Sequence, residues 1–104
     1  MPRDAFSGHV DLLLLSVLAR GQDHGYGLID ALRDRSGGVF DLAEGTVYPA
    51  LYRLERSGLV TSTWREVAGR RRRVYRLTGR GAEALRRRRS EWREQVRAVE
   101  TVLA

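Results

Sequence analysis

The sequence of 104 residues has the length of one small domain, and its net charge of +6 comes from nineteen arginines set against thirteen acidic residues. The absence of cysteine excludes a disulfide framework and thiolate metal sites, and the two histidines lie apart, so we expect no metal and no other cofactor. No stretch is long enough to cross a membrane, and the lack of cysteine fits the reducing cytoplasm, where we expect the protein to act.

The first predicted helix covers residues 8–20, with Ser7 as its N-cap and Gly21 as its stop. Its apolar residues fall on two opposite faces, of which the second contains Leu12, Leu15 and Ala19. A helix that is apolar on both sides needs two surfaces to pack against. Because so small a domain has a modest core, we expect one surface to belong to a second subunit, with Leu12 and Leu15 in the dimer interface.

The second predicted helix covers residues 24–35 and is ended by Gly37 and Gly38. Gly25 falls on its apolar face, where the missing side chain lets a neighbouring helix approach closely. Tyr26 falls off that face. Its ring and hydroxyl are therefore available to a phosphate or a partner chain, with packing at the edge of the domain as the alternative.

The third predicted helix covers residues 45–57 and carries an apolar stripe on one side. Its other side holds a β-branched residue, two tyrosines and two arginines, which is unusual for a solvated surface. Such side chains can contact base edges in the major groove of DNA, and an arginine can pair with guanine. We therefore predict a base-reading surface, with ordinary solvated helix positions as the alternative. Its members are Thr46, Tyr48, Tyr52, Arg53 and Arg56.

A β-hairpin is predicted next, with strands at residues 59–66 and 72–77 and a turn centred on Gly69. The order of helix, turn, helix and hairpin predicts a winged helix-turn-helix, mainly α with a small β-hairpin, in which the hairpin is the wing. Four arginines lie at the tip and the start of the returning strand. A basic wing would bind DNA phosphates, with a solvated hairpin as the alternative. These residues are Arg70, Arg71, Arg72 and Arg73.

Positive charge is concentrated in one part of the chain. Residues 65–97 hold thirteen arginines and four glutamates, a net +9, whereas the rest of the chain has a net −3. This asymmetry indicates a polyanionic partner. The arginine run at residues 86–89 is less informative, because four consecutive helical residues point in nearly all directions, and we interpret it mostly as a solvated surface.

The last predicted helix begins after Thr78 and reaches Leu103. Residues along it that are apolar except for Arg89 alternate spacings of three and four, the pattern of a seam between two helices with one polar interruption. Trp92 in the middle of the seam is either plain packing or the floor of a small-molecule pocket. We predict a DNA-binding domain at residues 1–78 and a C-terminal dimerisation helix at residues 79–104, in one compact unit. The predicted dimer contacts of the helix are Leu85, Trp92, Val96, Val99 and Leu103.

Several short motifs resemble the core of the PadR family of transcriptional regulators. They are His24-Gly25-Tyr26-Gly27, Gly45-Thr46-Val47-Tyr48-Pro49-Ala50-Leu51, Leu54-Glu55-x-x-Gly58-Leu59-Val60 and Tyr75-x-Leu77-Thr78-x-x-Gly81. The resemblance implies a homodimer, joined through its first and last helices, that represses transcription. It also implies that a flat aromatic effector can bind at the interface, and Trp92 is the position to which this role is carried over.

Two positions depart from the family pattern. Glu44 stands where a proline is common, and Val74 stands where the family often has a second aromatic residue in the returning strand. A carboxylate near a helix N-terminus stabilises the helix but repels a nearby phosphate, so Glu44 bears on DNA affinity.

No motif for catalysis is present, since the chain has no HExxH sequence and no phosphate-binding glycine loop, and we expect no enzyme activity. The expected partners are double-stranded DNA with a pseudo-palindromic operator, a second copy of the chain and a small-molecule effector, with no membrane. The alternative is a ligand-sensing or protein-binding dimer that binds polyanions without sequence specificity.

Overall fold

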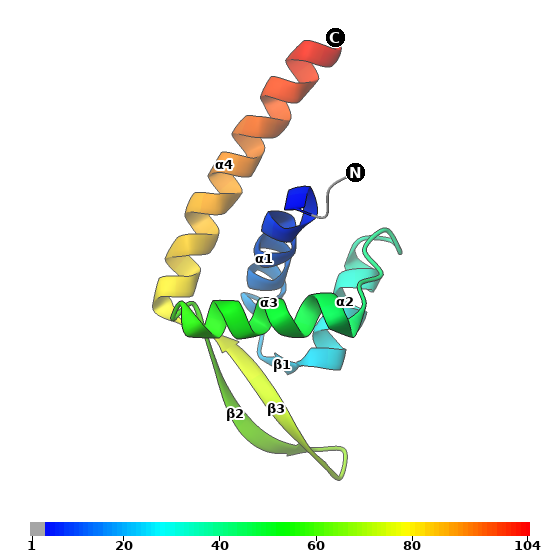
Figure 1. Ribbon diagram of the computed structural model, residues 1–104, viewed down its shortest axis with the longest axis vertical. Helices are drawn as coiled ribbons and strands as arrows, with labels where there is room; N and C mark the ends of the chain where they lie inside the picture. Colours follow the sequence, from blue (N-terminus) through cyan, green and yellow to red (C-terminus); the bar gives the residue numbers. More distant parts are fainter. Residues whose placement is uncertain (1–3) are drawn as a thin grey trace.

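The chain folds into helices and antiparallel strands, and the computed structural model describes residues 4–104. The helix α4 and the hairpin formed by β2 and β3 project from the helical body in opposite directions (Figure 1). This arrangement confirms the predicted fold class, a mainly helical winged helix-turn-helix with a long C-terminal helix. No helix within residues 4–104 is both long and apolar enough to cross a membrane. In chain order the elements are α1 (Asp4–Leu18), β1 (Asp23–His24), α2 (Gly25–Arg35), α3 (Glu44–Arg56), β2 (Val60–Val67), β3 (Arg70–Leu77) and α4 (Gly79–Leu103).

The helix α1 lies at the centre of the helical body, because it contacts α2, α3 and α4. Leu14 and Leu15 are both completely buried in the apolar core. The prediction that Leu15 lies in a dimer interface is therefore wrong, since this side chain is enclosed in the core of its own chain. Leu12, which was assigned to the same interface, is half-buried. The helix also begins at Asp4, so Ser7 lies inside it and is not its N-cap.

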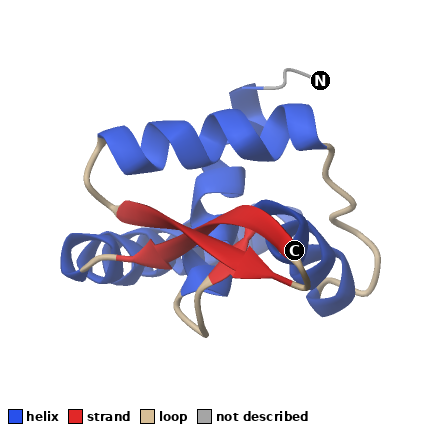
Figure 2. Cartoon of the chain, turned by 90° about the horizontal axis from the view of Figure 1, so that it is seen from below, coloured by secondary structure: helices blue, strands red, loops and turns tan. Residues whose placement is uncertain are grey.

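The strand β1 was not predicted, because two residues are too few to show the alternation of a strand. It pairs antiparallel with β3, which gives a sheet of order β1-β3-β2 (Figure 2). The helix α2 consequently starts at Gly25, one residue later than predicted, with His24 as its N-cap. The backbone N–H of Gly27 donates to His24 Nδ1 at 3.1 Å, which satisfies one of the free donors at the start of the helix.

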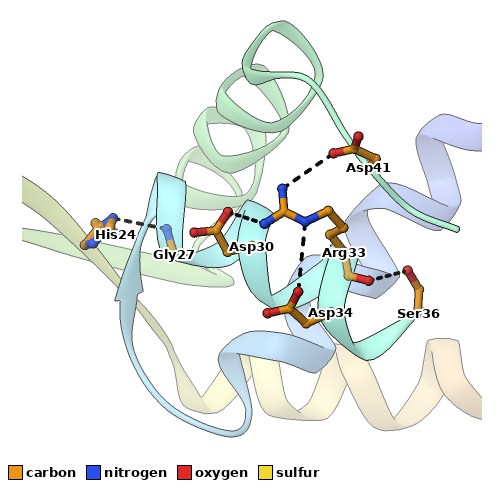
Figure 3. Close-up of polar contacts among 7 residues, drawn as sticks. All are labelled: His24, Gly27, Asp30, Arg33, Asp34, Ser36 and Asp41. Carbon is orange, nitrogen blue, oxygen red and sulfur yellow. Dashed lines mark hydrogen bonds and ion pairs between the residues drawn. The ribbon is translucent and has the colours of Figure 1, made fainter. Parts of the chain in front are cut away.

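The connection between α2 and α3 is held by Arg33, whose guanidinium faces three carboxylates (Figure 3). The nitrogen–oxygen distances are 3.0 Å to Asp30, 3.9 Å to Asp34 and 3.8 Å to Asp41. Asp41 belongs to the loop that precedes α3. Its ion pair with Arg33 therefore ties this loop to the end of α2 and helps to set the position of α3.

The hairpin turns through two residues, Ala68 and Gly69, whose φ angles are +52° and +78°. Both angles lie in the left-handed region that two-residue hairpin turns of type I′ require. The turn predicted around Gly69 is therefore too long, and the four consecutive arginines lie within β3 and not at the tip. Since side chains alternate along a strand, Arg71 and Arg73 point to one face of the hairpin and the other two arginines to the opposite face.

The helix α4 joins the helical body through its first turns, where Ala84 and Leu85 are buried. The prediction of Leu85 as a dimer contact is wrong, because this residue completes the apolar core of its own chain. Thr78 caps the helix. Its Oγ1 accepts from the backbone N–H of Gly81 at 3.0 Å and donates to the carbonyl of Gly58 at 2.7 Å. The capping residue thus also fastens α4 to the turn that follows α3.

Gly81→Ala is expected to lower the free energy of unfolding by about 2 kcal/mol. A Cβ at this position would overlap the backbone carbonyl of Leu59, which cannot move without opening the turn between α3 and β2. Urea denaturation followed by circular dichroism measures the change. Gly79→Ala is the matched control, because it lies in the same helical turn with open space around it and should be neutral or slightly stabilising. Equal stability of the two variants would contradict the close approach.

Candidate nucleic-acid interface

The helix α3 has one buried and one exposed side, as its sequence predicts. Tyr52 on the exposed side keeps 61% of its surface accessible. Arg56 Nη1 donates to the Tyr52 hydroxyl at 3.1 Å, and its guanidinium carbon lies 5.7 Å from the centre of the Tyr52 ring. Thr46 in the first turn is exposed as well. These predicted base-reading side chains are therefore accessible to a ligand. The buried stripe consists of Val47, Ala50, Leu51 and Leu54.

Arg53 is exposed, as its sequence predicts, with 52% of its side chain accessible, but its guanidinium is directed towards α1. Its Nη2 lies 3.1 Å from Asp11 Oδ1, and Arg88 of α4 places Nη1 3.8 Å from Asp11 Oδ2. The side chain of Asp11 is only 18% exposed, and a carboxylate with so little solvent is stabilised by cationic partners. Arg53 occupies the border between the two sides of α3, where α3 packs across α1, and there it supplies one of these partners. Its guanidinium is thus engaged with Asp11, whereas Tyr52 and Arg56 contact each other.

Tyr48 is not fully outward either, because its ring packs against α2. A Cβ at Gly25 would overlap this ring, so the glycine makes the close approach of α2 and α3 that its position in the sequence predicts. Burial raises the pKa of Tyr48, and the neighbouring Tyr26 adds to the rise. The hydroxyl consequently remains a hydrogen-bond donor at neutral pH. Tyr48 lies at the edge of the exposed face, half-buried.

A groove separates α3 from the wing, and we call it the α3–β3 groove. Its cavity next to α3 has a volume of about 570 Å³. One wall is fixed by Arg73, whose Nε donates to Ser62 Oγ at 2.8 Å and whose Nη2 lies 3.8 Å from Glu55 Oε2. Ser62 Oγ in turn donates to the same carboxylate oxygen at 2.7 Å. The lining residues are Tyr48, Tyr52, Glu55, Arg56, Arg73 and Tyr75.

A second hollow of about 350 Å³ shares lining residues with this cavity and reaches the wing. The guanidinium carbons of Arg71 and Arg73 lie 5.2 and 5.5 Å from the ring centre of Trp64. The sequence did not single out Trp64, although the correct register, in which Trp64 faces Arg73, would have indicated it. Because the predicted turn was too long, that register could not be derived. The hollow is lined by His24, Gly25, Tyr48, Trp64, Arg71, Arg72, Arg73 and Tyr75.

Tyr26 lies beside the start of α3 and makes two contacts that the sequence did not predict. Its hydroxyl donates to Glu44 Oε1 at 3.2 Å, and the guanidinium carbon of Arg72 lies 5.2 Å from its ring centre. The sequence predicted that this hydroxyl would be free, but it is engaged with a carboxylate. Glu44 is the first residue of α3, where its negative charge complements the helix dipole.

The outer part of α4 exposes the remaining residues of the predicted seam. Trp92 keeps 40% of its surface accessible, and Val96, Val99 and Leu103 are also exposed. The Trp92 ring makes an edge contact with His9 of α1 at 4.8 Å between ring centres. Beside it lies a cavity of about 280 Å³ between α1 and α4. Its lining residues are His9, Asp11, Leu12, Arg88, Glu91, Trp92 and Gln95.

No group of three metal-ligating side chains is brought together anywhere in the part of the chain that the structure describes. The charged side chains of the groove are instead guanidinium groups, with Glu55 as a carboxylate partner. Guanidinium groups bind phosphates and the acceptor edges of bases. The chemistry that this surface offers is therefore anion and base recognition.

Comparison with known proteins gives consistent matches over most of the chain. The family model described as the transcriptional regulator PadR-like family matches residues 14–87. A transcriptional regulator of Mycobacterium tuberculosis is 42% identical over 90 residues, which cover 86% of this chain and 81% of the relative. A transcriptional regulator of Escherichia coli is 36% identical over 100 residues, which cover 94% of this chain and 45% of the relative. The chain thus spans less than half the length of the E. coli relative.

Solved structures show the same arrangement of elements. A transcriptional regulator from Clostridium thermocellum superposes with a TM-score of 0.86 at 28% sequence identity, covering 94% of this chain and 96% of that chain. A PadR family transcription regulator from Clostridium difficile superposes with a TM-score of 0.79 at 33% identity, covering 92% and 99%. The similarity to these two structures includes α4 as well as the winged helix, because it extends over nearly the full length of each chain.

Proposed function

The chain belongs to the PadR-like family of transcriptional regulators, and on this basis we propose that it is a homodimeric repressor that binds a pseudo-palindromic DNA operator. The observation that carries this proposal is the α3–β3 groove. It combines exposed side chains of α3 with arginines of the wing on one continuous surface. A helix that reads bases and a basic strand that binds phosphates are the two parts that sequence-specific DNA recognition requires.

Base reading is assigned to the exposed side of α3. Arg56 is the side chain suited to pair with guanine O6 and N7, and its contact with Tyr52 fixes its direction before DNA binds. Thr46 and Tyr52 are suited to thymine methyl groups and to the backbone. Tyr48 contributes from the edge of the groove, and Arg53 is left out because it is paired with Asp11.

Phosphate binding is assigned to Tyr26 and to the four consecutive arginines that begin β3, Arg70 to Arg73. Arg71, Arg72 and Arg73 each lie against an aromatic ring and line the hollow beside α2. Arg70 is exposed nearer the tip of the wing. The hydrogen bond from Tyr26 to Glu44 has to be exchanged for one to DNA, so Glu44 lowers the affinity that Tyr26 can contribute.

Dimerisation is assigned to α4 together with Leu12 of α1. Exposed apolar residues on the outer part of α4 continue beyond the contacts with the body of its own chain. A two-fold dimer built on this helix would place its two α3 helices in successive major grooves about 34 Å apart. Residues 1–78 are then the DNA-binding domain and residues 79–104 the dimerisation helix, in one compact unit.

Relief of repression is assigned to a small aromatic ligand in the cavity beside Trp92. The exposed indole and the His9 ring provide flat aromatic surfaces there. Asp11 and Arg88 line the same cavity and can orient polar groups of the ligand.

Competition between DNA duplexes tests the proposal. A labelled fragment selected from the source genome for tight binding should need at least about a thousandfold more random competitor for its displacement than a labelled random duplex of equal length needs. Fluorescence anisotropy with a labelled fragment measures both affinities at one salt concentration. Equal competition by the two duplexes would support the alternative, a dimer that binds polyanions without reading sequence.

A further inference from the structure

Trp64 is an exposed aromatic residue without a place in the apolar core. It lies in β2 on the wing and keeps 54% of its surface accessible. An indole in this position contributes little to folding by burial, because much of its surface remains in water. Its contacts are instead with charged side chains of the neighbouring strand. Its presence on the wing therefore calls for a reason other than core packing.

The register of the hairpin places two arginines against this one indole. Arg73 faces Trp64 directly across the strands, and Arg71 faces Glu66, two residues further along the same face. Both guanidinium carbons lie within 6 Å of the ring centre, the range in which cation–π attraction operates. Two positive charges so close on one face repel each other. The shared ring and the carboxylate of Glu55, which pairs with Arg73, offset part of this repulsion.

Stacking leaves the arginines able to bind DNA. A guanidinium group uses its flat face for an aromatic ring, whereas its N–H donors lie in the plane and point outward. Arg73 is held further by Ser62 and Glu55, so its direction is set from more than one side. An arginine that is ordered before binding loses less side-chain freedom when it contacts a phosphate.

We propose that Trp64 is a positioning residue that pre-orders Arg71 and Arg73 as a pair of phosphate-binding groups on the wing. This inference rests on the proposed DNA-binding function and adds a residue that neither the sequence motifs nor the comparisons assign. Trp64 itself supplies no charge. Its removal therefore weakens DNA binding without changing the number of phosphates that are neutralised, and this separates its role from that of the arginines.

The test measures affinity and salt dependence separately, with a fluorescein-labelled random duplex of about 30 base pairs as the probe. Trp64→Ala is expected to bind about tenfold more weakly than the unmodified protein, because the side chains of Arg71 and Arg73 then have to be ordered when DNA binds. The slope of log affinity against log salt should stay the same. Arg71→Ala, in contrast, should reduce the magnitude of that slope by about 0.9.

Two further variants keep the test decisive if Trp64→Ala lowers the stability of the wing. Trp64→Phe retains an aromatic face and should restore most of the affinity. Trp64→Leu retains apolar bulk without a π face and should bind as weakly as the alanine variant. Thr63→Ala is the control, because its exposed side chain lies on the opposite face of the same strand and should leave binding unchanged.

Three results would overturn the inference. The first is an affinity of Trp64→Ala within about twofold of the unmodified protein. The second is a reduced salt slope for this variant, which would show that phosphate contacts are lost and not merely disordered. The third is equal affinity of the phenylalanine and leucine variants. Failure of the unmodified protein to bind any duplex would instead refute the proposed function, and the inference with it.

Discussion

Val96→Glu combined with Val99→Glu is expected to convert the protein into a monomer that binds its operator at least about a hundredfold more weakly. Both valines are exposed on the outer part of α4, where the proposed dimer buries them. Burying two unpaired carboxylates is strongly unfavourable, so the interface should not form. A monomer can occupy only one half-site at a time and loses the gain from two linked contacts. Light scattering after gel filtration should then give the mass of one chain, 11.8 kDa.

The matched control places the same added charge on the other side of the helix. Ser90→Glu combined with Thr101→Glu introduces two carboxylates at exposed positions that lie opposite the valines on the helical wheel. This double variant should remain a dimer and keep most of its operator affinity. A dimer that survives the valine substitutions would show that α4 does not carry the interface.

Arg71→Ala combined with Arg73→Ala is expected to weaken binding to any duplex by about 30- to 100-fold near physiological salt. Each arginine is proposed to neutralise one phosphate, so the salt slope should decrease in magnitude by about 1.8. Preference for the operator over random DNA should change much less, because phosphate contacts carry no direct sequence information. Anisotropy titrations between about 50 and 200 mM salt measure both quantities.

Arg86→Ala combined with Arg87→Ala removes the same charge from the exposed surface of α4. This control should leave the salt slope nearly unchanged, because these side chains lie on α4 and outside the α3–β3 groove. An identical slope for the wing variant and the unmodified protein would remove the wing from the DNA-contacting surface.

Much of the fold could be predicted because the apolar spacing along each helix indicates which side is buried. Val47, Leu51 and Leu54 follow the helical period, and the structure buries all three. The same reasoning failed for Leu15 and Leu85. A helical wheel shows that a face needs to be covered, but it does not show whether the covering helix comes from the same chain or from a second one.

The sequence predicted which elements form the candidate site, but not which side chains of the site contact one another. Arg53 was placed outward because it falls outside the apolar stripe, yet its partner Asp11 is 42 residues away and is brought near only by the packing of α3 on α1. The partners of Trp64 depend on the hairpin register, which a change in turn length shifts. Contacts of this kind follow from the tertiary structure, and no local pattern contains them.

The carboxylate of Asp11 connects three helices in a way that affects how a signal would travel through the molecule. It pairs with Arg53 of α3 through one oxygen and with Arg88 of α4 through the other. A large change in the angle between these two helices would therefore separate one pair of charges. Asp11 and Arg88 also line the cavity beside Trp92. A molecule that entered this cavity and bound the carboxylate would weaken the contact of α1 with α3 as well as its contact with α4.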